Sequence, residues 1–354
     1  MNIKSLLIGS AAALAAVSGA QAADAIVAAE PEPLEYVRVC DAFGTGFFYI
    51  PGTETCLKFG GYIRFQTDFG RNESGTSDWD SFTRAQFHID TRTDTELGAL
   101  RGFIELRGDA DNDSERSVRV NQAFIELSGL RVGYTFTWWD DDLSGETDIL
   151  SSNSTRGNAL RYTYDAGSFY AGISVEELET ERDDETNLGI AKGGFLENAN
   201  NVGISGIIGA KFGVVSANLL GSYDTDYENG AIRAIVTADI GPGTFGLSGA
   251  WASGANSYYE ESEWTVAAEY AIKATDKLTI TPGAQYFGTV DIGADNDFVG
   301  DRDAWRAGVT VDYQITQGLA TKVTVNYQDV DGDEGIDSGA GDQVTGFVRL
   351  QRTF

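Results

Sequence analysis

Residues 81–93 read SFTRAQFHIDTRT and alternate between two kinds of side chain. The odd positions, among them Thr83, Phe87 and Ile89, carry apolar or weakly polar side chains, whereas the even positions from Arg84 to Arg92 carry charged or polar ones. Successive side chains of a β-strand point to opposite faces, so one face of this segment suits lipid and the other suits water. That combination is typical of a strand in a transmembrane β-barrel.

The same alternation returns throughout residues 57–354 in sixteen runs, an even number as a closed single-chain barrel requires. The runs are 57–69, 81–93, 96–107, 118–128, 130–137, 159–165, 168–175, 201–211, 213–223, 231–240, 243–252, 264–273, 277–288, 304–315, 318–328 and 343–354. The run 304–315 also places Trp305 and Tyr313 near its two ends, where a barrel meets the membrane interfaces. We therefore predict an all-β fold, a sixteen-stranded antiparallel transmembrane barrel.

The connections between runs alternate between short and long. The short ones leave room only for tight turns, and the long ones hold 37 of the chain's 54 acidic residues. The net charge of -29 is thus concentrated at one rim, and a hydrophobic content of 42% is too high for a disordered chain. A soluble β-sandwich shares the alternation but does not explain two classes of connection. We expect short periplasmic turns, long external loops and no binding of nucleic acid, which requires cationic surfaces.

The first residues are predicted to be a signal peptide, residues 1–22. Lys4 forms a short charged region, an apolar run spans residues 6–17, and Ala20-Gln21-Ala22 precedes the expected cleavage point. An N-terminal membrane anchor is the alternative, but the apolar run is shorter than the ~20 residues that a spanning helix needs.

Residues 23–56 are expected to form a periplasmic segment before the barrel, residues 57–354. Cys40 and Cys56 are the chain's two cysteines, and an oxidising compartment favours a disulfide between them. A free pair or a metal site is the alternative, although two thiols in a chain with one histidine make a poor ligand set. Residues 47–50 could form a small strand that Pro51-Gly52 closes.

Four segments, MNIKSLL (1–7), EYVRVCDA (35–42), FYIPGTETCL (48–57) and VRLQRTF (348–354), resemble the general porins of rhizobial-type alphaproteobacteria. The resemblance implies a homotrimeric outer-membrane channel for passive diffusion of small hydrophilic solutes and ions. Phe354 is similar to the aromatic end that outer-membrane assembly machinery recognises, although Arg352 stands where another apolar residue is usual.

The resemblance also implies that the segment after the fifth run, residues 137–158, folds inward and narrows the pore. Burial of Trp138, Trp139 and Leu143 would anchor it to the inner wall. The segment carries five acidic residues, Asp140, Asp141, Asp142, Glu146 and Asp148.

Alternation places a set of arginines on the lumen side of the runs: Arg64, Arg84, Arg101, Arg107, Arg161 and Arg349. Opposed rows of charge would create a transverse field that favours hydrated ions and dipolar solutes. Each arginine taken singly could equally pair with a local carboxylate such as Asp90 or Glu105. The acidic rim predicts a weak preference for cations, because salt screens charges over about 8 Å at 0.15 M.

The sequence also bears on metal binding, catalysis and solute specificity. Residues 329–334 superficially resemble a calcium loop but lack its glycine and its closing glutamate, so no cofactor or defined metal site is predicted. Looser bridging of divalent cations between rim carboxylates and lipopolysaccharide is the expectation instead. An outer-membrane hydrolase would have His88 as its single candidate base, and the chain contains neither G-x-S-x-G nor H-E-x-x-H. A solute-specific channel, for example for sugars, or a surface adhesin would share the barrel architecture.

Overall fold

A computed structural model describes residues 37–70, 77–111, 117–152, 155–178, 185–192, 201–334 and 336–354. The chain divides into two units after Arg38, and every named element lies in the second unit, Val39–Phe354. The predicted signal peptide lies outside the described residues, as does most of the segment predicted before the first cysteine. No helix in the described ranges is long and apolar enough to cross a membrane.

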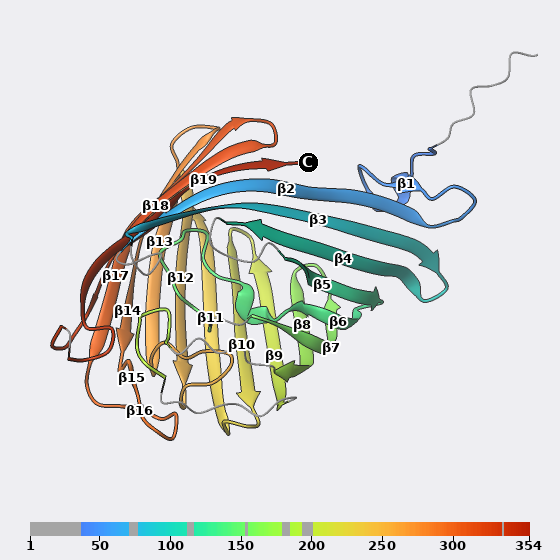
Figure 1. Cartoon of the computed structure of the whole chain (residues 1–354). Helices are drawn as coiled ribbons and strands as arrows, with labels where there is room; N and C mark the ends of the chain where they lie inside the picture. Colours follow the sequence, from blue (N-terminus) through green and yellow to red (C-terminus); the bar gives the residue numbers. More distant parts are fainter. Residues whose placement is uncertain are drawn as a thin grey trace, which may run out of the picture. The chain divides into compact units, whose positions relative to one another are not determined.

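Sixteen antiparallel strands form a closed barrel (Figure 1). They are β2 Cys56–Phe69, β3 Trp79–Thr95, β4 Gly98–Ala110, β5 Val118–Leu127, β6 Leu130–Phe136, β7 Arg156–Asp165, β8 Phe169–Leu178, β9 Asn201–Phe212, β10 Val215–Asp224, β11 Asn229–Ile240, β12 Gly243–Ala252, β13 Trp264–Lys273, β14 Leu278–Gly288, β17 Asp303–Thr316, β18 Leu319–Val330 and β19 Gly341–Thr353. The last strand closes the ring by pairing with the first, with Leu350 opposite Phe65. Each predicted run corresponds to one of these strands, which confirms the predicted fold class. Boundaries differ by at most three residues, as where β7 begins at Arg156.

The outer face of the barrel carries the apolar set of each alternating strand. In β2, for example, Phe59, Ile63 and Phe65 are exposed to the surroundings of the barrel. An exposed aromatic band crosses the long-loop ends of neighbouring strands β12, β13, β14 and β17 at Trp251, Trp264, Tyr286 and Trp305. Aromatic side chains concentrate at membrane interfaces, so this band marks the external edge of the apolar belt.

The short turns and the end of β19 lie at one rim of the barrel. Gly129 in the turn between β5 and β6 has a φ of 86°, and a Cβ there would lie 2.3 Å from the carbonyl oxygen of Thr163, so the turn requires glycine. Arg352, which departs from the usual apolar pattern of a last strand, donates a hydrogen bond to the carbonyl of Gly318 in the adjacent turn. Its polar head is thereby satisfied at the rim.

The long loops pack against one another at the opposite rim. A short hairpin, β15 Asp291–Ile292 and β16 Phe298–Val299, forms within the loop between β14 and β17. The segment 185–192 inserts Leu188 and Ile190, both buried, against Phe287 and Val290. These contacts were not predicted, because the loops have no periodic pattern. The described residues contain no group of three or more His, Cys, Asp or Glu side chains arranged to hold a metal ion.

The disulfide between Cys40 and Cys56 is confirmed, and it ties the segment before the barrel to the start of β2. Both cysteines pack in a small cluster with Phe47, and the predicted small strand appears as β1 Phe48–Tyr49, which pairs with β2. A short 3-10 helix, η1 Asp41–Phe43, lies in the closed loop.

Replacing both cysteines, as Cys40→Ser/Cys56→Ser, should release this segment but leave the barrel intact. Closing a loop of this length contributes about 3 kcal/mol by restricting the unfolded chain. We expect limited proteolysis to cut the double variant faster near residue 45, while the heat-modifiable electrophoretic shift of the folded barrel is unchanged. Loss of the folded barrel band would contradict a local role.

Candidate functional site: an inward loop and a basic wall

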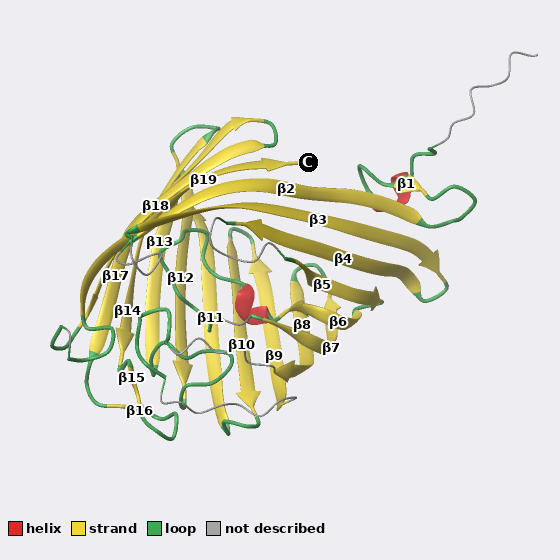
Figure 2. Cartoon of the chain, viewed as in Figure 1, coloured by secondary structure: helices red, strands yellow, loops and turns green. Residues whose placement is uncertain are grey.

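The described part of the loop between β6 and β7, residues 137–152 and 155, turns into the lumen instead of outward. It opens with a short 3-10 helix, η2 Trp138–Asp140, whose Thr137 hydroxyl accepts a hydrogen bond from the Trp139 amide (Figure 2). This loop is called the inward loop below. A loop inside the barrel has backbone N–H and C=O groups without partners in a strand ladder, so we expect side chains of the barrel wall to form hydrogen bonds with them.

Apolar side chains fix the inward loop to the wall at two points. Trp139 is 1% exposed, its ring lies beside those of Tyr258 and Tyr259, and its Nε1 donates to the Ser222 hydroxyl of β10 at 2.8 Å. Leu143 is buried with Leu150 against wall residues of β11 and β13. Full burial of each such side chain contributes on the order of 1.5–3 kcal/mol.

Arg233 of β11 supports the backbone of the inward loop from behind. Arg233 is 1% exposed, and its guanidinium donates to the carbonyls of Trp138 and Trp139 at 2.7 and 2.9 Å and to that of Leu150 at 3.2 Å. One buried side chain thus joins the beginning of the loop to its returning part.

Further wall residues hold the middle of the inward loop. Both Glu269 carboxylate oxygens on β13 accept backbone hydrogen bonds, from Ser144 and Gly145, each at 2.8 Å. Gln285 on β14 both accepts from the Ile149 amide and donates to its carbonyl. The loop therefore follows the wall from β10 to β17 rather than hanging free.

Glu146 forms the contact between the acidic inward loop and the basic side chains of the barrel wall. Its carboxylate lies 2.8 Å from the Lys322 ammonium of β18 and 3.6 Å from the Arg349 guanidinium of β19. Its backbone amide donates to the Thr310 hydroxyl of β17, and its carbonyl accepts from Asn326.

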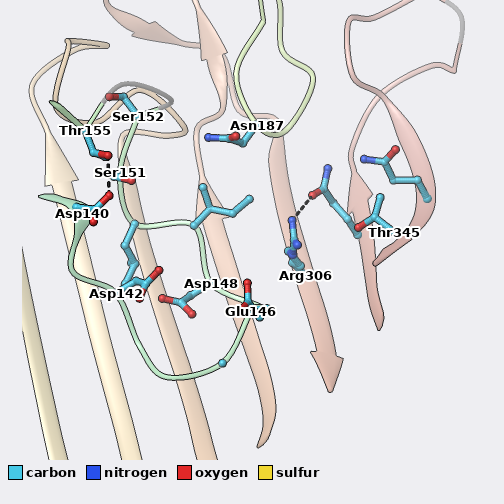
Figure 3. A pocket seen from close by; sticks show the side chains of 15 residues that line it. Asp140, Asp142, Glu146, Asp148, Ser151, Ser152, Thr155, Asn187, Arg306 and Thr345 are labelled. Carbon is cyan, nitrogen blue, oxygen red and sulfur yellow. Dashed lines mark hydrogen bonds between the residues drawn. The ribbon is translucent and has the colours of Figure 1, made fainter. Parts of the chain in front are cut away.

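Three other predicted acids face a cavity of about 550 Å³ on the external side of the inward loop (Figure 3). Asp140 accepts from the Thr155 hydroxyl, and Asp148 accepts from the Leu143 amide. Enclosure by the barrel and repulsion from Asp148, Glu146 and Asp140 raise the pKa of Asp142 to about 7. Enclosure is also the main cause that raises the pKa of Asp148 to about 6. Asp141 does not line this cavity.

Across the lumen, β2, β3 and β19 carry a row of arginines. Arg64 lies directly opposite Arg84 in the strand register, and Arg349 donates to the neighbouring Gln66 amide oxygen. Each guanidinium lies over a lumen-facing aromatic ring of its own strand, 4.8 Å from the Tyr62 ring centre for Arg64 and 4.1 Å from that of Phe347 for Arg349. Cation–π contacts of this kind hold the positive charges in fixed positions.

Other predicted arginines lie close to carboxylates of the barrel wall. Arg107 and Arg84 both lie near Asp109 of β4, at 3.7 and 2.6 Å. Arg101 is near the short-turn end and pairs with Asp90 at 3.1 Å, the local pairing that the sequence left open.

Arg161 of β7 lies on the opposite side of the loop from the basic row. It is buried, lies 3.5 Å from Glu176 and covers the Trp138 ring at 4.3 Å. It therefore packs against the base of the inward loop instead of facing it across the lumen.

Sequence reasoning did not select several residues that hold or face the loop. They are Arg233, Glu269, Gln285, Thr310, Lys322 and Asn326, together with Arg306 at the cavity. Each is a polar side chain on the lumen face of a strand, so alternation could have selected them as lumen residues. The contacts of the first six with residues more than 80 positions earlier could not be read from the pattern.

A closed barrel with an apolar outer belt, a polar lumen and a loop across its interior defines a pore-forming protein of the outer membrane. A model of the Porin subfamily matches residues 24–347, and the chain belongs to this family. It is an integral outer-membrane porin.

Relatives support this assignment over the full chain. The chain is 50% identical over 356 residues to outer membrane protein IIIA of Rhizobium leguminosarum bv. viciae, covering 96% of this chain and 93% of that one. It is 35% identical over 384 residues to porin Omp2b of Brucella neotomae, covering 100% of both. The predicted resemblance to alphaproteobacterial porins is thereby confirmed, and the relatives point to a channel rather than an enzyme.

Solved structures share the fold. The outer membrane channel DcaP of Acinetobacter baumannii aligns with a TM-score of 0.64 at 16% identity, covering 86% of this chain and 99% of that chain. A mutant of Rh. blastica porin aligns with a TM-score of 0.58 at 17% identity, covering 84% of this chain and 100% of that chain.

His88, the single candidate base of the hydrolase hypothesis, lies in the lumen wall with its ring stacked 5.5 Å from that of Phe103.

Proposed function

We propose that the inward loop and the arginine row form the constriction of a water-filled channel that passes small hydrophilic solutes and ions with a weak preference for cations. The observation that carries this proposal is the position of Glu146, which lies between Lys322 and Arg349 at the boundary of an acidic loop and a basic wall. Charges opposed across a narrow lumen create a transverse field. Asp142, Asp148 and the acidic long loops raise the local concentration of cations on the external side.

Reversal potentials in planar bilayers under a potassium chloride gradient test the cation preference. We expect potassium to be favoured at low salt, and the preference to weaken toward about 1 M, where the screening length falls to about 3 Å. Glu146→Gln should reduce the preference, and Asp165→Asn, at the short-turn rim, is the matched control. A reversal potential that favours chloride would contradict the proposal.

We also propose that three chains assemble into the working channel and that divalent cations link the acidic rim to lipopolysaccharide phosphates. Trimers should insert as three equal conductance steps. A chelator should lower the temperature at which the assembly dissociates in lipopolysaccharide but not in detergent alone.

Residues 1–22 are proposed to be removed on export, which N-terminal sequencing of the mature protein would test.

A further inference from the structure

We propose that the cavity on the external side of the inward loop binds small zwitterions of amino-acid size, with the solute carboxylate on Arg306 and its ammonium group on Asp142 and Asp148. This inference rests on the proposed channel and names a class of solute that would pause in it. The cavity of about 550 Å³ falls in the size range of small-molecule sites.

Arg306 is the positive charge of this cavity, and it lies on the same part of the wall that the acidic loop follows. In the register of β17 it stands directly opposite Gln285 on one side and Gln328 on the other, so its neighbours across both strands are neutral amides. Its Nη1 makes a long hydrogen bond of 3.4 Å to Gln328, and its buried Nε has no hydrogen-bond partner. Within the described ranges, Arg306 makes no ion pair with a carboxylate.

Two of the carboxylates that share the cavity, Asp142 and Asp148, likewise make no ion pair among the described residues. Asp142 makes no ion pair or hydrogen bond among the described residues, and Asp148 is held by backbone amides alone, chiefly that of Leu143. In Figure 3 both acids and Arg306 border the same space from opposite sides, the acids on the loop and Arg306 on β17. Charges of opposite sign, held apart by a gap that they do not close, complement a solute that carries a carboxylate and an ammonium group on one small framework.

Neutral polar groups complete the lining. Gln343, Thr345, Asn187 and Ser151 also border the cavity. Amide and hydroxyl groups suit the polar side chain of an amino acid and offer little to an apolar solute. A guanidinium binds a carboxylate through two parallel hydrogen bonds, which favours a carboxylate over a simple halide.

Block of potassium current through bilayer-reconstituted channels tests this assignment with three matched probes: L-glutamine, the cation L-glutaminamide and the anion N-acetyl-L-glutamine. We expect glutamine to block with a half-effect concentration about tenfold lower than either single-charge probe. Arg306→Gln should raise the glutamine value to that of glutaminamide and leave glutaminamide unchanged. Arg306→Lys should restore part of the effect, and Arg119→Gln, at a half-exposed site on β5 that does not line the cavity, should leave the order of the three probes intact.

Asp142→Asn tests the ammonium side independently, since it should weaken block by glutamine but not by N-acetyl-L-glutamine. Equal block by all three probes, or an unchanged preference for glutamine in Arg306→Gln, would overturn the inference while leaving the channel proposal in place. A folded wild-type protein that conducts no current would instead overturn the channel itself.

Discussion

Replacing Arg233 with methionine is expected to release the inward loop from the wall and to produce a larger, less selective conductance. The substitution leaves the carbonyls of Trp138, Trp139 and Leu150 without their donor at a buried position. Each buried group left unsatisfied costs about 1–3 kcal/mol, so the folded state should lose about 3 kcal/mol or more. The temperature of the heat-modifiable gel shift should fall, and single-channel conductance should rise.

Arg119→Met is the matched control, because it changes the same residue type at a half-exposed site 3.8 Å from Asp109. Its effect on stability should stay within about 0.5 kcal/mol. If Arg233→Met kept wild-type conductance and thermal stability, Arg233 would not be the support of the loop. If stability fell but conductance stayed the same, the loop would remain in place without it.

The sequence predicted the barrel because the evidence for it is local. Alternation within residues 81–93 shows which side of one strand meets lipid, and no knowledge of distant residues is needed. The same holds for the short turns, because a glycine such as Gly129 between two alternating runs indicates a tight turn by its residue type alone. Strand boundaries were less certain where a strand continues into a polar loop, as at Arg156. The residues there are polar or glycine, so no apolar side chain in the alternation shows where the strand begins.

The arrangement of the site depends on contacts between residues far apart in the chain. Alternation placed Arg161 and Arg349 on the lumen side alike, yet Arg349 faces Glu146 while Arg161 packs beneath Trp138. Which wall the loop follows depends on the closure and tilt of the whole barrel. For the same reason Glu269 and Arg233 could be recognised as lumen residues but not as partners of the loop.

The preference for cations should weaken as the pH falls from about 8 to about 5. A carboxyl group is negative above its pKa and neutral below it, and the pKa values of Asp142 and Asp148 are raised to about 7 and about 6. Acidification through this range therefore removes two negative charges from the external face of the constriction. Reversal potentials in a fixed potassium chloride gradient, measured over this pH range, should move toward zero in two overlapping steps.

Asp142→Asn should abolish the step near pH 7, lower the cation preference at pH 8 and leave the step near pH 6. The same variant should not destabilise the barrel at neutral pH. A carboxyl whose folded-state pKa is raised holds its proton more tightly in the folded protein, so its contribution to stability becomes less favourable as pH rises through that range. Asp165→Asn removes one charge at the short-turn rim, where Asp165 accepts from the Gly167 amide, and should leave both steps in place. A pH profile of Asp142→Asn identical to that of the wild type would show that other groups set the charge of the constriction.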